Sequence, residues 1–200
     1  MTGIIDYGPG NLFSLEKALK RNHVPYLVSN NPSELETCNR FILSGVGHFQ
    51  FGMEQLKEKN LVDFILNQVS EGKFLLGICL GMQLICESSE EGNVEGLKLV
   101  NATVKKLHVQ APYKIPHIGW NTVYEADQNP LFYQIDPESK FYFTHSFGVA
   151  SPATFGAGKT QYGDVEFHSA IQKNNVFGVQ FHPEKSFDQG LMLLRNFCSL

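Results

Sequence analysis

Cys79 is the residue best placed in this sequence to act as a nucleophile. It follows the apolar run at residues 74–78, which is typical of a buried strand, and it precedes a helical pattern at residues 80–87, with Gly77 and Gly81 on either side. This Gly-x-Cys-x-Gly spacing predicts a nucleophile elbow, a sharp strand-to-helix turn that glycines permit. The free N–H groups of a helix N-terminus favour a thiolate, the reactive form of cysteine. A small buried cysteine between two packing glycines is also compatible with the pentapeptide.

His182 and Glu184 can supply a base and the group that orients it. They lie in the segment VFGVQFHPEKS at residues 176–186, whose apolar residues alternate as in a half-buried strand. In an extended segment, residues two apart face the same side, so Glu184 can accept a hydrogen bond from one imidazole nitrogen while the other faces a thiol. Pro183 stiffens the pair. A lone His-Pro-Glu is more often a surface turn, but together with an elbow cysteine it predicts a Cys-His-Glu triad.

A third element is the stretch SGVG at residues 44–47, at the end of a predicted strand. Acyl transfer needs N–H donors aimed at the oxyanion. Leu80, the residue after the nucleophile, can supply one such donor. The glycine-rich stretch can supply another, because its backbone can approach closely and reorient its peptides. A plain turn is the alternative interpretation.

Motifs for other kinds of chemistry are missing from the sequence. The Gly-x-Gly pairs at residues 8–10 and 45–47 have Phe13 and Gln50 where a dinucleotide fingerprint needs its third glycine. The sequence contains no P-loop. The seven histidines show no His-x-x-x-His spacing for zinc. We therefore expect neither a cofactor nor a metal.

Strand and helix patterns alternate along the first part of the chain. Strands are predicted at residues 3–6, 25–28, 39–43 and 74–78, and helices at residues 12–19, 61–69 and 80–87, the first of them capped by Asn11. Short strands follow at residues 97–107, 113–117, 121–125, 141–143, 165–172 and 175–181, before a closing helix at 188–197. This order predicts an α/β fold, with a mixed, mostly parallel sheet between helices. With no linker or repeat, residues 1–200 are expected to form a single domain.

Composition limits the location and the partners of the chain. With 42% hydrophobic and 12% aromatic residues, the chain is globular and not disordered. A net charge of −4 gives no excess of positive charge with which to bind nucleic acid, and no apolar run is long enough for a membrane span. The N-terminus shows no signal peptide, and the four cysteines are scattered. We expect a cytoplasmic protein with free thiols that binds neither nucleic acid nor membranes.

Two segments in combination resemble a known family. GICLGMQ around Cys79 and QFHPEKS around His182 resemble the class I (triad) glutamine amidotransferases. Within that family, further stretches resemble the glutaminase subunits of imidazole glycerol phosphate synthase, an enzyme of histidine biosynthesis. These stretches are DYGPGNL at residues 6–12, HIGWN at 117–121, YFTHSF at 142–147 and the closing helix at 191–197. The resemblance spans nearly the whole chain and implies an open, twisted mixed sheet flanked by helices, of the flavodoxin-like kind.

The resemblance also implies a role for each site residue. Cys79 would be the nucleophile, His182 the general base and acid, and Glu184 its orienter. L-glutamine would be hydrolysed through a thioester to glutamate and ammonia. Val46 and Leu80 would line the oxyanion hole with backbone N–H groups. The glutamine would be held by Gly47, Gln83, His145 and Ser146.

The family's partner is a (β/α)₈-barrel cyclase subunit, which forms a heterodimer with the glutaminase and takes its ammonia. The residues themselves also favour a partner, because the chain has a hydrolytic triad but no phosphate loop or basic cluster for a second substrate. Ammonia released into water would be protonated and diluted, which transfer into a closed neighbouring site avoids. The residues expected to meet the partner are Asn11, Trp120, Asn121, Tyr142 and Lys185.

Two residues depart from the family pattern. Ser44 stands where proline is usual, and Phe147 where tyrosine is common. Loss of the proline is expected to free the oxyanion stretch, because proline fixes its own φ. Two alternatives stay open: the same glutaminase chemistry feeding a paralogous barrel partner in another pathway, such as surface-sugar amidination, and a non-catalytic interaction module. The intact triad argues against the module.

Overall fold

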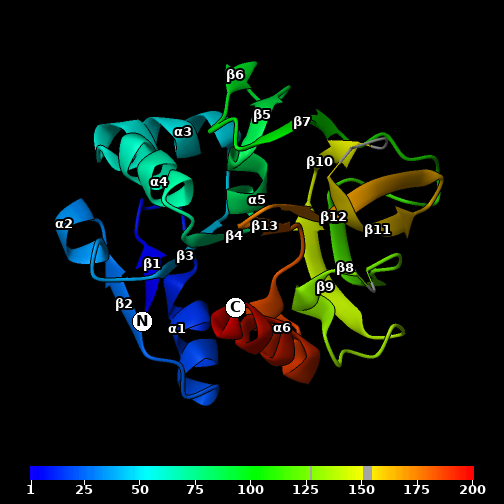
Figure 1. Cartoon of the computed structure of the whole chain (residues 1–200). Coiled ribbons are helices and arrows are strands. Elements are labelled where there is room, and N and C mark those ends of the chain that lie inside the picture. The colour runs from blue at the N-terminus through cyan, green and yellow to red at the C-terminus, as the bar shows by residue number, and fades with distance from the viewer. Residues whose placement is uncertain (127, 151–154) are drawn as a thin grey trace.

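The computed structural model describes residues 1–126, 128–150 and 155–200 of the chain. One mixed sheet runs through the described part of the molecule (Figure 1). Its parallel half consists of β1 (Thr2–Ile5), β2 (Tyr26–Ser29), β3 (Arg40–Gly45), β4 (Phe74–Cys79) and β13 (Val176–Val179). The predicted α/β class with a mixed sheet is confirmed.

The other strands extend this sheet and add a small second one. The further strands are β5 (Cys86–Ser89), β6 (Val94–Glu95), β7 (Val100–Lys106), β10 (Phe147–Ala150), β11 (Gly156–Tyr162) and β12 (Val165–Lys173). Across the described residues the order is β2-β1-β3-β4-β13-β12-β10-β7-β5-β6, with β11 paired to β12. β8 (His117–Thr122) and β9 (Lys140–His145) form a separate antiparallel pair. β4 therefore lies between β3 and β13, which brings three predicted functional segments to one edge.

Helices cover both faces of the parallel half (Figure 1). α1 (Leu12–Arg21) and α6 (Phe187–Ser199) lie on one face, while α3 (Phe49–Glu58), α4 (Leu61–Ser70) and α5 (Leu80–Leu84) lie on the other. A short α2 (Pro32–Leu35) follows β2. Each face has its own apolar core, because the buried stripe of each helix packs against the sheet. In α1, for example, the buried residues are Leu15, Ala18 and Leu19, at helical spacing.

Several predicted elements differ from those in the structure. The helix expected at residues 80–87 ends at Leu84, because Cys86 starts a strand that pairs with Val100 of β7. Pairing within the sheet overrides the helical pattern here. The strand expected at residues 113–117 begins only at His117, after Pro116, which has no N–H for a ladder. Asn11 stands at the N-cap of α1, but its side chain makes no capping hydrogen bond.

α3 has no counterpart among the predicted elements. It contains Gly52, a weak helix former. A Cβ at Gly52 would lie 3.2 Å from Leu84 and 3.3 Å from Leu80, so the glycine lets α3 pack closely on α5. The residue that weakens the local helix signal therefore serves a tertiary contact that supports the turn at Cys79.

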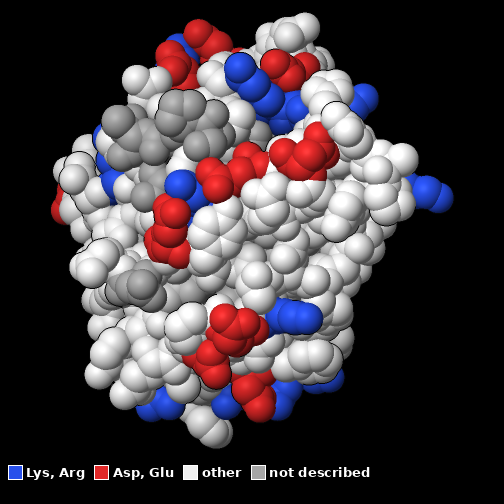
Figure 2. Space-filling view, turned by 90° about the vertical axis from the view of Figure 1, so that its right-hand side faces the viewer, with Lys and Arg blue, Asp and Glu red and all other residues white. Residues whose placement is uncertain are grey.

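The face that carries β8, β9 and β11 is largely uncharged, and no large cluster of Lys and Arg lies on the described part of it (Figure 2). None of the helices in the described ranges is both long and apolar enough to cross a membrane.

Candidate active site

Cys79 lies at the turn between β4 and α5, as the spacing of its glycines predicts. Its backbone has φ 53° and ψ −108°, a region that non-glycine residues rarely adopt and that costs free energy. The neighbouring glycines are sterically required. A Cβ at Gly77 would lie 2.6 Å from the backbone of Gly81, and a Cβ at Gly81 would collide with the carbonyl oxygen of Leu43. The predicted nucleophile elbow is confirmed in its geometry.

His182 and Glu184 form a hydrogen-bonded pair. The Nδ1 atom of His182 lies 2.8 Å from Oε1 of Glu184, and both side chains are fully buried. Pro183–Lys185 form a 3₁₀ turn, so the prediction that an extended segment aligns the two side chains is wrong. The proline-led turn folds the carboxylate back onto the ring instead.

The hydroxyl of Ser186 links the backbone of His182 to that of Tyr142. Its Oγ donates to the carbonyl oxygen of His182 at 2.6 Å and accepts from the backbone N–H of Tyr142 at 3.0 Å. The His182 N–H donates in turn to the Tyr142 carbonyl oxygen at 2.8 Å. His182 is thereby tied to β9, a strand distant in the sequence.

The charges around His182 favour its protonated form. Burial disfavours the charged ring, but the Cys79 sulfur and the Glu184 carboxylate outweigh burial and raise the pKa of His182 to about 10. The Nε2 atom makes no hydrogen bond of ordinary geometry among the described residues, yet the Cys79 sulfur is close enough to act on the ring. An imidazolium beside the sulfur stabilises a thiolate by charge attraction.

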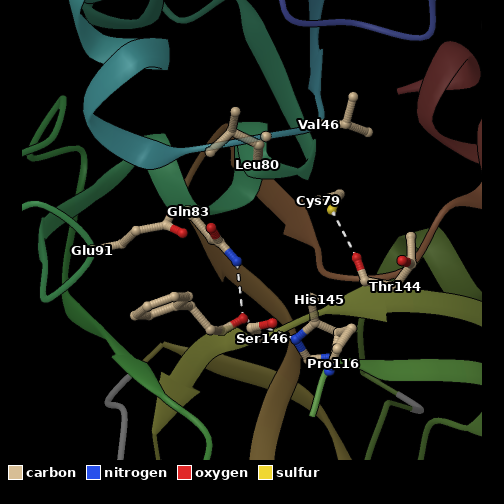
Figure 3. Close-up of a pocket in the computed structure, with 11 residues that line it drawn as sticks. Val46, Cys79, Leu80, Gln83, Glu91, Pro116, Thr144, His145 and Ser146 are labelled. Carbon is tan, nitrogen blue, oxygen red and sulfur yellow. Dashed lines mark hydrogen bonds between the residues drawn. The ribbon is translucent and has the colours of Figure 1, made fainter.

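A cavity of about 260 Å³ opens beside Cys79 (Figure 3). It is lined by residues from five parts of the chain. The predicted residues among them are Val46, Gly47, Cys79, Leu80, Gln83, His145 and Ser146. The structure therefore brings all the predicted glutamine and oxyanion residues to one hollow.

The two predicted oxyanion donors differ in availability. Leu80 is the first residue of α5, where a backbone N–H has no acceptor within the helix. The N–H of Val46, in contrast, donates to the carbonyl oxygen of Pro9 at 2.9 Å. Val46 lines the cavity, but in this conformation its N–H points to the loop before α1 and not to an oxyanion.

His145 lines the cavity, but both of its ring nitrogens are already hydrogen-bonded within the protein. Its Nδ1 lies 2.8 Å from the carbonyl oxygen of Phe147, which can only accept, so Nδ1 carries the proton. Its Nε2 then accepts from Nδ1 of His117 at 3.1 Å. Burial lowers the pKa of His145 to about 3 and that of His117 to about 4, so both rings are neutral at physiological pH. His145 therefore shapes the wall of the cavity and does not offer a hydrogen bond to a ligand.

Glu91 is a cavity residue that the sequence did not reveal. Its carboxylate lines the hollow on the side of Gln83 (Figure 3). One oxygen, Oε2, accepts from the N–H of Phe49 at 2.8 Å, at the N-terminus of α3. A glutamate in a polar turn carries no local signal, because only the packing of β5 and α3 brings it to the cavity. A carboxylate here suits a ligand that carries an ammonium group.

The described residues contain no cluster of side chains suited to a metal ion. All four cysteines are free. The elbow at Cys79 and the hydrogen-bonded His182–Glu184 pair suit nucleophilic attack by the cysteine, assisted by a histidine that a carboxylate orients.

Comparison with known proteins gives close full-length matches. Residues 3–199 match the family described as Glutamine amidotransferase class-I. The chain is 46% identical over 199 residues to imidazole glycerol phosphate synthase subunit HisH of Moorella thermoacetica, covering 98% of this chain and 93% of the relative. It is 43% identical to subunit HisH 1 of Campylobacter jejuni (strain RM1221), with 100% of both chains covered.

Solved structures show the same fold. A crystal structure described as a glutamine amidotransferase matches with a TM-score of 0.76 at 16% identity, covering 100% of this chain and 99% of the other. PurLQS from Thermotoga maritima matches with a TM-score of 0.73 at 18% identity, covering 99% and 97%. At these identities the likeness concerns the fold alone.

Proposed function

Because this chain belongs to the class I glutamine amidotransferase family and, within it, to the HisH subunits of imidazole glycerol phosphate synthase, we propose that Cys79, His182 and Glu184 are the triad with which it hydrolyses L-glutamine. The observation that carries this proposal is the placement of Cys79 at a strained elbow in the wall of a cavity. His182 is hydrogen-bonded to Glu184, and the Cys79 sulfur is close enough to help raise the pKa of His182.

The first half of the reaction forms a thioester. The Cys79 thiolate attacks the side-chain amide carbon of glutamine, and a sulfur–carbon bond forms. The protonated His182 then gives its proton to the amide nitrogen, the carbon–nitrogen bond breaks, and ammonia leaves. Glu184 stabilises the imidazolium and holds its Nδ1 proton, which keeps Nε2 directed at the reaction.

The second half releases glutamate. Water attacks the glutamyl thioester while His182, now neutral, takes a proton from it. The carbon–sulfur bond breaks, the carboxylic acid that forms loses the second proton of the water to solvent, glutamate departs, and Cys79 returns to the thiolate beside an imidazolium. The pair ends in the charge state in which it began, so no cofactor is consumed.

Groups around the cavity match those of free glutamine. The Glu91 carboxylate suits the α-ammonium group, and the backbone near Gly47 and Ser146 can donate to the α-carboxylate. The Leu80 N–H suits the oxyanion. The second donor, Val46, is available only after its bond to Pro9 opens. We infer that the chain alone turns over slowly and that full activity requires this stretch to rearrange.

The chain functions as a subunit, like its HisH relatives, and we infer that its partner is a (β/α)₈-barrel cyclase that receives the ammonia for histidine biosynthesis. An exposed aromatic surface supports this inference. The rings of Trp120 and Phe187 stack with centroids 4.8 Å apart and are 41% and 70% exposed. Tyr142 packs beside Trp120, and the Lys185 ammonium lies 5.7 Å from the Tyr142 ring centroid. Such aromatic residues are enriched at protein interfaces.

The test is the glutamine turnover of the purified chain, first alone and then with the barrel cyclase and its ribonucleotide substrate. A low rate that rises steeply with the cyclase is expected. If the rate of hydrolysis does not respond to the cyclase, the glutaminase activity is confirmed but this partner is excluded, and a paralogous acceptor is favoured. No hydrolysis under either condition, in protein whose Cys79 is intact, would reject the proposal and favour a non-catalytic module.

A further inference from the structure

Gln180 is a fully buried polar residue that the triad leaves unexplained. Its side chain is 0% exposed, and it precedes His182 by two residues, just after β13. Its backbone N–H donates to the carbonyl oxygen of Ser169 at 2.9 Å, which fixes its position in the sheet. A buried amide needs partners for both its oxygen and its nitrogen. Both partners belong to the active site.

The orientation of the Gln180 amide follows from its neighbours. The carbonyl oxygen of Phe147 can only accept, so the group of Gln83 that lies 2.9 Å from it must be the amide nitrogen (Figure 3). The same nitrogen donates to Oε1 of Gln180 at 3.1 Å. Nε2 of Gln180 is thereby turned toward the Sγ atom of Cys79, 3.7 Å away.

The charge of the sulfur decides what this contact contributes. A neutral thiol is a weak acceptor, whereas a donor bonded to a charged partner contributes much more. The other polar contact of Sγ, at 3.9 Å, is the carbonyl oxygen of Thr144, which can only accept and so pairs with the protonated thiol. The Gln180 amide is therefore a donor that favours the thiolate, in addition to the imidazolium of His182.

We propose that Gln180 is a catalytic residue whose side-chain N–H group binds the Cys79 sulfur and stabilises the attacking thiolate, with Gln83 holding that amide in place. The proposal rests on the proposed function, in which Cys79 is the nucleophile. Gln180 is not among the residues that line the cavity, so its loss is expected to lower kcat and to leave the KM for glutamine nearly unchanged.

The test compares Gln180→Leu and Gln180→Glu with the unaltered chain. Leucine removes the donor without adding charge. Glutamate keeps the shape and an acceptor for Gln83, but it turns a carboxylate toward the sulfur. Gln172→Leu is the matched control, because Gln172 is a partly buried glutamine on β12 outside the cavity lining. The rate at which iodoacetamide alkylates Cys79 is measured against pH, together with glutamine kinetics and a circular dichroism check of folding.

In both Gln180 variants the midpoint of the alkylation profile is expected to rise, by about one to two pH units for leucine, with a larger rise for glutamate. The kcat is expected to fall about ten- to a hundredfold, while the control matches the unaltered chain. If one variant does not fold, the other decides. A folded variant whose alkylation profile coincides with that of the unaltered chain would overturn the proposal, even if kcat falls. Alkylation needs no glutamine, so this result is independent of whether the chain hydrolyses it.

Discussion

The backbone N–H of Val46 donates to the carbonyl oxygen of Pro9 at 2.9 Å, which ties the predicted oxyanion stretch to the loop between β1 and α1. Every residue predicted to line the cavity beside Cys79 does so. One of the two expected oxyanion donors, the Val46 N–H, nevertheless faces away from the position of the reaction. Removing one oxyanion donor costs an enzyme of this kind about a hundredfold or more in kcat. We therefore expect the isolated chain to hydrolyse glutamine slowly while this hydrogen bond is in place.

The Val46 amide is expected to exchange slowly with solvent in the isolated chain and faster once the barrel cyclase and its substrate raise the turnover. The reason is that the bond to Pro9 protects the amide and must open to free the donor. Hydrogen exchange followed by NMR measures this, with the buried Ile42 of β3 as an internal control that stays protected. Unchanged Val46 protection in a fully active complex would show that this donor is not used.

Replacement of Glu184 by glutamine is expected to lower kcat about a hundredfold or more, with little change in the KM for glutamine. The amide carries no charge to stabilise the imidazolium. The pKa of His182, which Glu184 helps to raise to about 10, is then expected to fall, and the alkaline limb of the rate profile moves to lower pH. Glu87→Gln, an exposed glutamate on β5, is the control. A kcat equal to that of the control would exclude an orienting role for Glu184.

Replacement of Glu91 by glutamine is expected to raise the KM for glutamine about tenfold while kcat stays within about twofold. Glutamine retains an oxygen for the Phe49 N–H but cannot pair with an ammonium group. Glu90→Gln is a close control, because the neighbouring Glu90 is exposed and accepts from the Lys106 N–H at 3.0 Å. Steady-state kinetics separate the two parameters. If both variants show the KM of the unaltered chain, Glu91 does not bind the substrate.

The free energy of unfolding is expected to fall as the pH drops from about 6.5 toward 4. His117 and His145 have folded-state pKa values lowered to about 4 and about 3 by burial, so over this range the unfolded chain binds more protons. Between pH 7 and 5, each such histidine removes about 2 kcal/mol. His182 affects the free energy of unfolding in the opposite direction. Because its pKa is raised, its stabilising contribution is lost only as the pH rises toward 10.

Urea unfolding at pH 7 and pH 5 measures this effect. A His117→Gln variant, which cannot titrate, is expected to lose less stability between the two pH values than the unaltered chain. Equal losses in the two proteins would mean that His117 is not the source of the acid sensitivity.

Local patterns in the sequence were enough to predict the strand-to-helix turn at which Cys79 lies. Gly77 and Gly81 flank Cys79 because side chains at these two positions would collide with backbone atoms. A steric requirement of this kind produces a glycine spacing that can be recognised in the sequence. The short spacing from His182 to Glu184 also predicted a hydrogen-bonded pair, although a 3₁₀ turn and not an extended segment forms it. Periodicity likewise predicted the class of fold, since alternating strands and helices build a layered sheet.

Contacts between distant segments were decided only by the tertiary structure. The bond from Val46 to Pro9, the entry of Glu91 into the cavity and the contact of Gln180 with Cys79 each join residues far apart in the chain. They depend on which strands become neighbours and on how closely α3 packs on α5. Hydrogen bonds of this kind depend on where the residues lie in space, so no residue spacing along the sequence predicts them. The sequence thus determined the chemistry of the site, whereas the packing of β3, β4 and β13 decided which donors and charges surround the sulfur.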